Sequence, residues 1–103
     1  MAPPAATTFA YKLTPPRPTF ALDMSEAEAA VMGEHAAYWQ PRVEQGDVLV
    51  FGPVLEPAAT WGLAVVLADD EEAVRALGDA DPAVASGLAT YEVFPMPGAV
   101  VAR

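Results

Sequence analysis

The side chain best suited to proton transfer is His35, the only histidine in the chain. Histidine titrates near neutrality, so an imidazole at the wall of a pocket can act as a general base or a general acid. A capping-box sequence that starts at Ser25 predicts the beginning of a helix upstream of His35. On that helix His35 borders the apolar stripe, where its ring can face a pocket. The alternative is a structural role at the edge of the core, with the ring bonded to a backbone carbonyl.

Three further residues could line such a pocket: Tyr38, Gly52 and Pro53. Tyr38 could add a hydroxyl group, or it could lie at a dimer edge. Gly52 and Pro53 end a predicted strand where the pocket is expected, and glycine lets the backbone approach a ligand closely. An ordinary turn explains these two residues equally well. Trp39 falls on a different side of the helix from Tyr38, and we expect it in the core.

The sequence has no recognisable cofactor or metal site. It contains one histidine and no cysteine, and its carboxylates lack the spacing of metal ligands. It also lacks a glycine-rich phosphate loop and the G-x-S-x-G pattern of serine hydrolases. We therefore expect any chemistry to proceed without a cofactor.

The charge distribution argues against two classes of partner. The formal net charge is −9, from 14 acidic and 5 basic residues, and the basic residues form no run. Nucleic-acid binding depends on clustered lysine and arginine, and anionic membrane surfaces repel an acidic protein. No apolar run reaches the roughly 18–20 residues that a membrane helix needs. The N-terminus lacks the pattern of a secretory signal, so we expect a cytoplasmic protein.

Residue patterning predicts a single domain over residues 1–103, with tails at 1–6 and 97–103 around a core of about 7–96. Runs of apolar, β-branched and aromatic residues predict four strands, at residues 7–13, 48–51, 61–68 and 88–94.

Three helical segments are expected between these strands. The first runs from Ser25 to a glycine stop at Gly46, and the second follows the acidic residues 69–72 and ends at Gly78. Asp81 opens a further helical turn as its N-cap. Outside these elements, we expect a stiff proline-rich loop at residues 14–18 and a tail or short exchanged strand at 99–102.

The resulting order, βαββαβ, predicts an α+β ferredoxin-like fold, in which two helices cover one face of a four-stranded antiparallel sheet. The runs 48–51 and 61–68 lack polar alternation, which is typical of strands that are buried on both faces. An uncovered apolar sheet is unfavourable in a monomer. We therefore expect a homodimer packed sheet against sheet, with Phe51 and Trp61 in the interface.

Three segments resemble the YCII-related family: H-x-x-Y-W on the first helix, G-D-V-L-V-F-G-P, and A-D-P-A-V-A-S-G-L followed by a strand that ends in F-P-M. The resemblance implies a dimeric ferredoxin-like α/β barrel, a fold also found in muconolactone isomerases and small cofactor-free monooxygenases. It also implies a catalytic pair, which by position is His35 and Asp81. Capping and pairing with His35 are compatible roles for Asp81, since a carboxylate has two oxygens. Asp79 is the nearby competitor, but it lacks the Asp-Pro context.

Some members of the family are linked to dehydrochlorination of aromatic ring-cleavage intermediates. Together with the histidine, this favours a small cofactor-independent enzyme that performs acid–base chemistry of the isomerase or lyase type on a small organic molecule. The alternative is a non-catalytic module that binds a small molecule or another protein.

Overall fold

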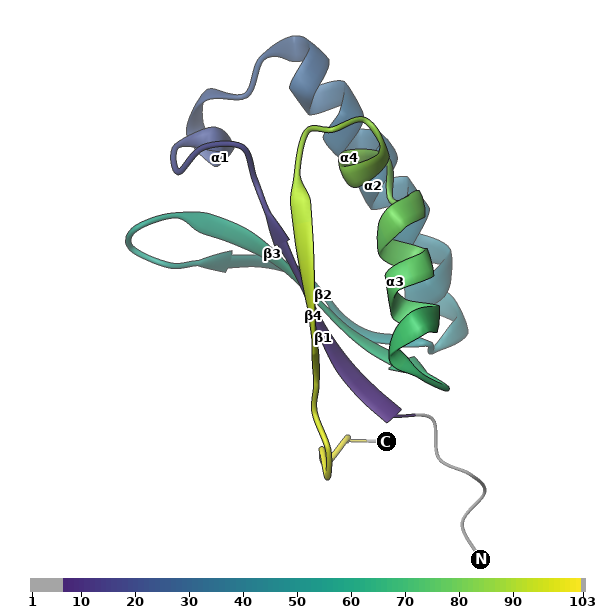
Figure 1. Cartoon of the computed structure of the whole chain (residues 1–103). Coiled ribbons are helices and arrows are strands. Elements are labelled where there is room, and N and C mark those ends of the chain that lie inside the picture. Colours follow the sequence, from purple (N-terminus) through teal and green to yellow (C-terminus); the bar gives the residue numbers. More distant parts are fainter. Residues whose placement is uncertain (1–6, 103) are drawn as a thin grey trace, which may run out of the picture.

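The protein is built on a four-stranded antiparallel sheet in the order β2-β3-β1-β4, seen in a computed structural model that describes residues 7–102 (Figure 1). Two longer helices and two short ones accompany the sheet. In chain order the elements are β1 (Thr7–Thr14), α1 (Phe20–Asp23), α2 (Glu26–Gln45), β2 (Val48–Leu55), β3 (Thr60–Ala68), α3 (Glu71–Ala80), α4 (Pro82–Ala85) and β4 (Thr90–Pro95). This is the predicted ferredoxin-like arrangement. The predicted tail at residues 1–6 lies outside the described residues.

The helices α2, α3 and α4 lie together on one face of the sheet (Figure 1). Side chains alternate along a strand, so every second residue of the central strand β1 faces these helices. Phe9, Tyr11 and Leu13 take these positions and are buried. They form the core with Trp39, which is fully buried as expected.

The ends of α2 are set by the predicted signals. Ser25 accepts a hydrogen bond from the Glu28 backbone, and the Glu28 side chain bonds back to the Ser25 backbone, which completes the capping box. Gly46 ends the helix in the left-handed conformation, with φ of 86°, which glycine adopts without strain. Both predictions are confirmed, and together they fix the stretch of helix that carries His35.

Two local predictions are wrong, and one short helix was not predicted. The helix α3 does not end at Gly78 but continues to Ala80. Gly52 and Pro53 do not end a strand, because β2 continues through both to Leu55. The continuation is possible since β2 is an edge strand, where proline removes no ladder hydrogen bond if its nitrogen faces outward. In addition, the chain after the proline-rich loop forms the short helix α1, which is anchored by the buried side chain of Phe20.

No element within residues 7–102 covers the opposite face of the sheet. Val50 of β2 and Phe94 of β4 are about half exposed there, at 52% and 48%. Trp61 alternates to this face, where the Lys12 ammonium lies 4.9 Å from its ring centre. Phe51, in contrast, packs on the helix side against Trp39, so its predicted place in a sheet interface is wrong. The bulge between Val48 and Val50 shifts the alternation of β2, which explains the error.

The described helices include none that is both long and apolar enough to span a membrane. Residues 99–102 form no strand within the chain. The cytoplasmic location remains a prediction.

Candidate active site

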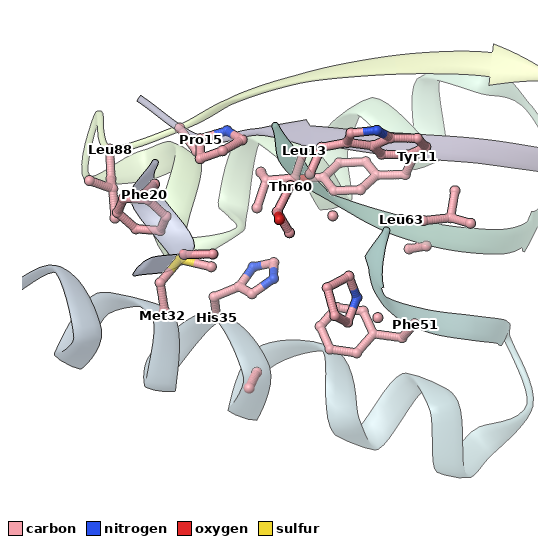
Figure 2. A pocket seen from close by; sticks show the side chains of 18 of the residues that line it. Tyr11, Leu13, Pro15, Phe20, Met32, His35, Phe51, Thr60, Leu63 and Leu88 are labelled. Carbon is pink, nitrogen blue, oxygen red and sulfur yellow. The ribbon is translucent and has the colours of Figure 1, made fainter. Parts of the chain in front are cut away.

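A pocket of about 300 Å³ lies between α2 and the helix-facing side of the sheet (Figure 2). Strands β1, β2 and β3 supply its wall opposite the helix, and α1 with the turn before β4 closes one end. The lining is mainly apolar, with Leu13, Phe20, Met24, Met32, Phe51 and Leu88 among the contributing side chains. Such a lining is typical of a site for a small organic molecule.

His35 projects from α2 into this pocket (Figure 2). Its side chain is 9% exposed, and its ring centre lies 5.4 Å from that of Phe51. Met32 precedes it by nearly one helical turn and also lines the cavity. The border position predicted for His35 therefore corresponds to a pocket wall.

Asp81 lies directly behind His35 and is fully buried. It is placed there by the junction between α3 and α4, where it caps α4 by accepting a hydrogen bond from the Ala83 backbone at 2.9 Å. His35 Nδ1 is 2.8 Å from Oδ1 and 2.9 Å from Oδ2 of Asp81. The Tyr11 hydroxyl and the Trp39 indole each donate to Oδ2 at 2.9 Å. Four donors from three elements, β1, α2 and α4, thus converge on one carboxylate.

This arrangement determines where the proton of a neutral His35 ring lies. An ionised carboxylate only accepts hydrogen bonds, so Nδ1 must carry the hydrogen. The other ring nitrogen, Nε2, then has a free lone pair and is available to the pocket. The carboxylate also stabilises the imidazolium that forms when Nε2 takes up a proton.

The surroundings of the site shift the pKa values of Asp81 and of its hydrogen-bond partner Tyr11. Burial acts to raise the pKa of Asp81, but the hydrogen bonds from His35, Trp39 and Ala83, together with the charge of His35, outweigh it and lower the pKa below its usual value. Burial, and then the Asp81 charge and hydrogen bond, raise the pKa of Tyr11. Asp81 is therefore ionised and Tyr11 neutral at physiological pH.

The other residues singled out from the sequence have different positions. Gly52 and Pro53 line the pocket. Tyr38 does not: its hydroxyl donates to the Leu77 carbonyl at 2.8 Å, between α2 and α3. Asp79 accepts a hydrogen bond from Tyr91 at an exposed position and is not bonded to His35.

Several residues of the site were not predicted as such. Trp39 is expected in the core, and its indole also donates a hydrogen bond to Asp81. The sequence signal for this second role is the spacing of four residues between His35 and Trp39, which places both side chains on one face of the helix. Tyr11 and Phe20 have no local signal, because their proximity to His35 arises from tertiary structure.

The segment that contains α1 is fastened over one end of the pocket by Arg17. Its guanidinium forms a bidentate pair with Glu28 of α2, with both distances 2.8 Å, and also bonds Asp23 at 2.8 Å. The Arg17 hydrogen bond is the main cause that lowers the pKa of Glu28 to about 2. This clasp, as we call the Arg17–Asp23–Glu28 group, holds Phe20 in the pocket wall.

Among the described residues, no cluster of three or more His, Asp or Glu side chains is arranged to hold a metal ion. The expectation of cofactor-independent chemistry remains a prediction.

The model of the YCII-related domain matches residues 9–97, and the chain belongs to this family. Comparison with curated proteins gives no match. Among solved structures, the chain is similar to 5-chloro-2-hydroxyhydroquinone dehydrochlorinase from Burkholderia phenoliruptrix AC1100, in a complex with 2,5-dihydroxybenzoquinone. The TM-score is 0.65 at 18% sequence identity, over 84% of this chain and 89% of the other. This likeness supports the ferredoxin-like fold.

Proposed function

We propose that the protein is a small cofactor-independent enzyme that performs acid–base chemistry, of the isomerase or lyase type, on a small organic molecule. The observation that carries the proposal is the His35–Asp81 pair, in which Nδ1 is held by the buried carboxylate and the ring projects into an apolar pocket. A structural histidine at the edge of a core does not require an adjacent cavity of this size.

In the proposed reaction, His35 Nε2 accepts a proton from an acidic O–H group, or from a C–H group next to a carbonyl. The electron pair left behind moves into the conjugated system of the substrate. The imidazolium then returns the proton to another atom of the substrate, which is an isomerisation, or an anionic leaving group departs with the electron pair, which is an elimination. Asp81 orients the ring and stabilises its charged form; such positioned acid–base catalysis contributes roughly 10²–10⁴ in rate.

The aromatic side chains and the size of the pocket support a ring-shaped substrate. Aromatic side chains such as Phe20 and Phe51 can pack against a flat molecule, and the volume of about 300 Å³ suits a substituted single ring. The similar dehydrochlorinase binds an oxygenated six-membered ring. We therefore place phenols, hydroquinones and enolisable ketones first among the substrates to test.

The enzyme test is a panel of these compounds, including 5-chloro-2-hydroxyhydroquinone, incubated with the protein in D₂O. NMR and chloride analysis detect deuterium incorporation at carbon, isomerisation or chloride release. We expect His35→Gln to lower the rate on a reacting compound by at least about 10²-fold. The control is Glu34→Gln, at the adjacent exposed position of α2, which should leave the rate unchanged. Compounds that bind the wild type with no reaction in any assay would instead favour the non-catalytic binding module.

We also propose that the protein acts as a homodimer in which the uncovered sheet faces meet. The half-exposed Val50 and Phe94 support this arrangement, since large apolar patches on a monomer are unfavourable. Light scattering at micromolar concentration should give twice the mass of the 10.8 kDa chain. A mass of one chain would contradict the dimer.

A further inference from the structure

The polar atoms that line the pocket are few, and most of them are already bonded. The Tyr11 hydroxyl donates to Asp81, and the Trp61 indole donates to Glu56 at 2.9 Å. The described residues that line the pocket include no lysine or arginine. Among the lining side chains of the described protein, His35 Nε2 and the Thr60 hydroxyl therefore remain for a polar ligand.

Thr60 faces His35 across the cavity. It is the first residue of β3, and alternation along the strand places it on the same face as Gly62 and Ala64, the side that the helices cover. Figure 2 shows its hydroxyl oxygen directed into the space above the His35 ring. Within residues 7–102 this hydroxyl makes no hydrogen bond, so it is free to bind a ligand.

The position of Thr60 is held by the hairpin that joins β2 to β3. Thr60 pairs with Leu55 at the end of the sheet ladder. On the other side of the strand, the neighbouring Trp61 bonds Glu56, and the Ala59 backbone bonds the Glu56 carbonyl at 3.1 Å. Because these contacts fix the backbone at Thr60, little backbone ordering is needed when the hydroxyl binds a ligand, which favours discrimination between ligands.

We propose that Thr60 is a specificity-determining residue that binds an oxygen atom of the ligand from the sheet side of the pocket, while His35 faces the ligand from α2. The proposal rests on the proposed use of this pocket as a substrate site. With a hydroxyl on the sheet wall, an imidazole on the helix wall and no cationic side chain among the described lining residues, the pocket selects a neutral ring compound that carries more than one polar group. A ligand that places a methyl group against Thr60 would leave the Thr60 hydroxyl shielded from water and unpaired, which is unfavourable.

The role of Thr60 can be tested with a double-mutant-type cycle that changes one group on the ligand and one group on the protein. Hydroquinone and p-cresol differ only in a hydroxyl or methyl group opposite the phenol, and Thr60→Val makes the same exchange on the protein. NMR titrations under anaerobic conditions give four dissociation constants. We expect wild type to prefer hydroquinone, and Thr60→Val to reduce this preference about three- to tenfold, the usual value of a net hydrogen bond. Thr60→Ser, which retains the hydroxyl, should retain the preference.

Two results would overturn the proposal: a hydroquinone preference that is identical in wild type and Thr60→Val, or no binding of either compound to wild type at millimolar concentrations. The cycle measures binding alone, so its result is independent of turnover. If coupling is found and no compound reacts, the enzyme proposal fails while Thr60 keeps its role. If turnover depends on His35 and no coupling is found, only the assignment of Thr60 fails.

Discussion

The substitution Asp81→Asn tests how strongly the buried carboxylate holds the site together. Asp81 is fully buried and accepts hydrogen bonds from Tyr11, His35, Trp39 and Ala83. Asparagine keeps one acceptor oxygen, but its amide group would face donors in place of the second oxygen. At least one or two donors lose their acceptor, at a cost of about 1–3 kcal/mol each. We therefore expect the free energy of unfolding to fall by about 3 kcal/mol.

Equilibrium unfolding in urea, at one protein concentration for all variants, measures this change. The matched control is Asp79→Asn, two positions away, since Asp79 accepts its hydrogen bond from Tyr91 at an exposed position. The control should change the free energy of unfolding by less than about 0.5 kcal/mol. A loss below about 1 kcal/mol for Asp81→Asn would contradict this prediction, because it would mean that the four donors are satisfied without the second oxygen.

Four further predictions concern pH, packing and the clasp. The pKa of Asp81 is lowered in the folded protein, so the ionised carboxylate stabilises the fold above the unfolded pKa of about 4, and this stabilisation is lost as the pH falls through the folded pKa. The difference in the free energy of unfolding between wild type and Asp81→Asn should therefore become smaller when urea unfolding is measured at acidic pH. The pKa of Tyr11 is raised, so the stabilisation by the neutral Tyr11 hydroxyl is lost as the pH rises above about 10. Tyr11→Phe should therefore make the free energy of unfolding fall less steeply with pH in alkaline solution; equal slopes for wild type and variant would contradict this. Gly78→Ala should destabilise the protein by about 1–3 kcal/mol, because a Cβ at this position would lie 2.7 Å from a tyrosine ring. Gly33→Ala, in open space on α2, should instead stabilise it by about 0.5–1 kcal/mol. Thermal unfolding that ranks the two variants in the reverse order would be inconsistent with this packing. Arg17→Gln removes the clasp and should speed amide hydrogen exchange across α1 while exchange in the sheet stays unchanged; protection of α1 at the wild-type level would show that the clasp is dispensable.

Much of the fold could be predicted because its signals are local. The capping box at Ser25 and the glycine at Gly46 satisfy the backbone groups at the ends of one helix, so they are readable without tertiary information. The end of β2 was not readable, since Pro53 breaks an interior strand but is tolerated in an edge strand, and strand order is a tertiary property.

The site shows the same division. The cap position of Asp81 follows from its Asp-Pro sequence. Its contact with His35 joins residues 46 positions apart, and only the family resemblance pointed to it. The roles of Tyr11 and Phe51 depend on which face of the sheet each side chain occupies, and in β2 a bulge reverses that alternation. The position of α1 at one end of the pocket depends on the Arg17 clasp, which no local sequence pattern predicts.

The most direct test of the account is the protonation of the two ring nitrogens of His35. The chain has one histidine, so ¹⁵N-histidine labelling gives one pair of ring signals, read by long-range ¹H–¹⁵N NMR at a pH where the ring is neutral. The His35–Asp81 geometry predicts a hydrogen on Nδ1, bound to Asp81, and a bare Nε2 that faces the pocket. A hydrogen on Nε2, or a rapidly exchanging mixture of the two tautomers, would contradict this prediction, because Asp81 would then not hold the ring in the form that presents a base to a substrate.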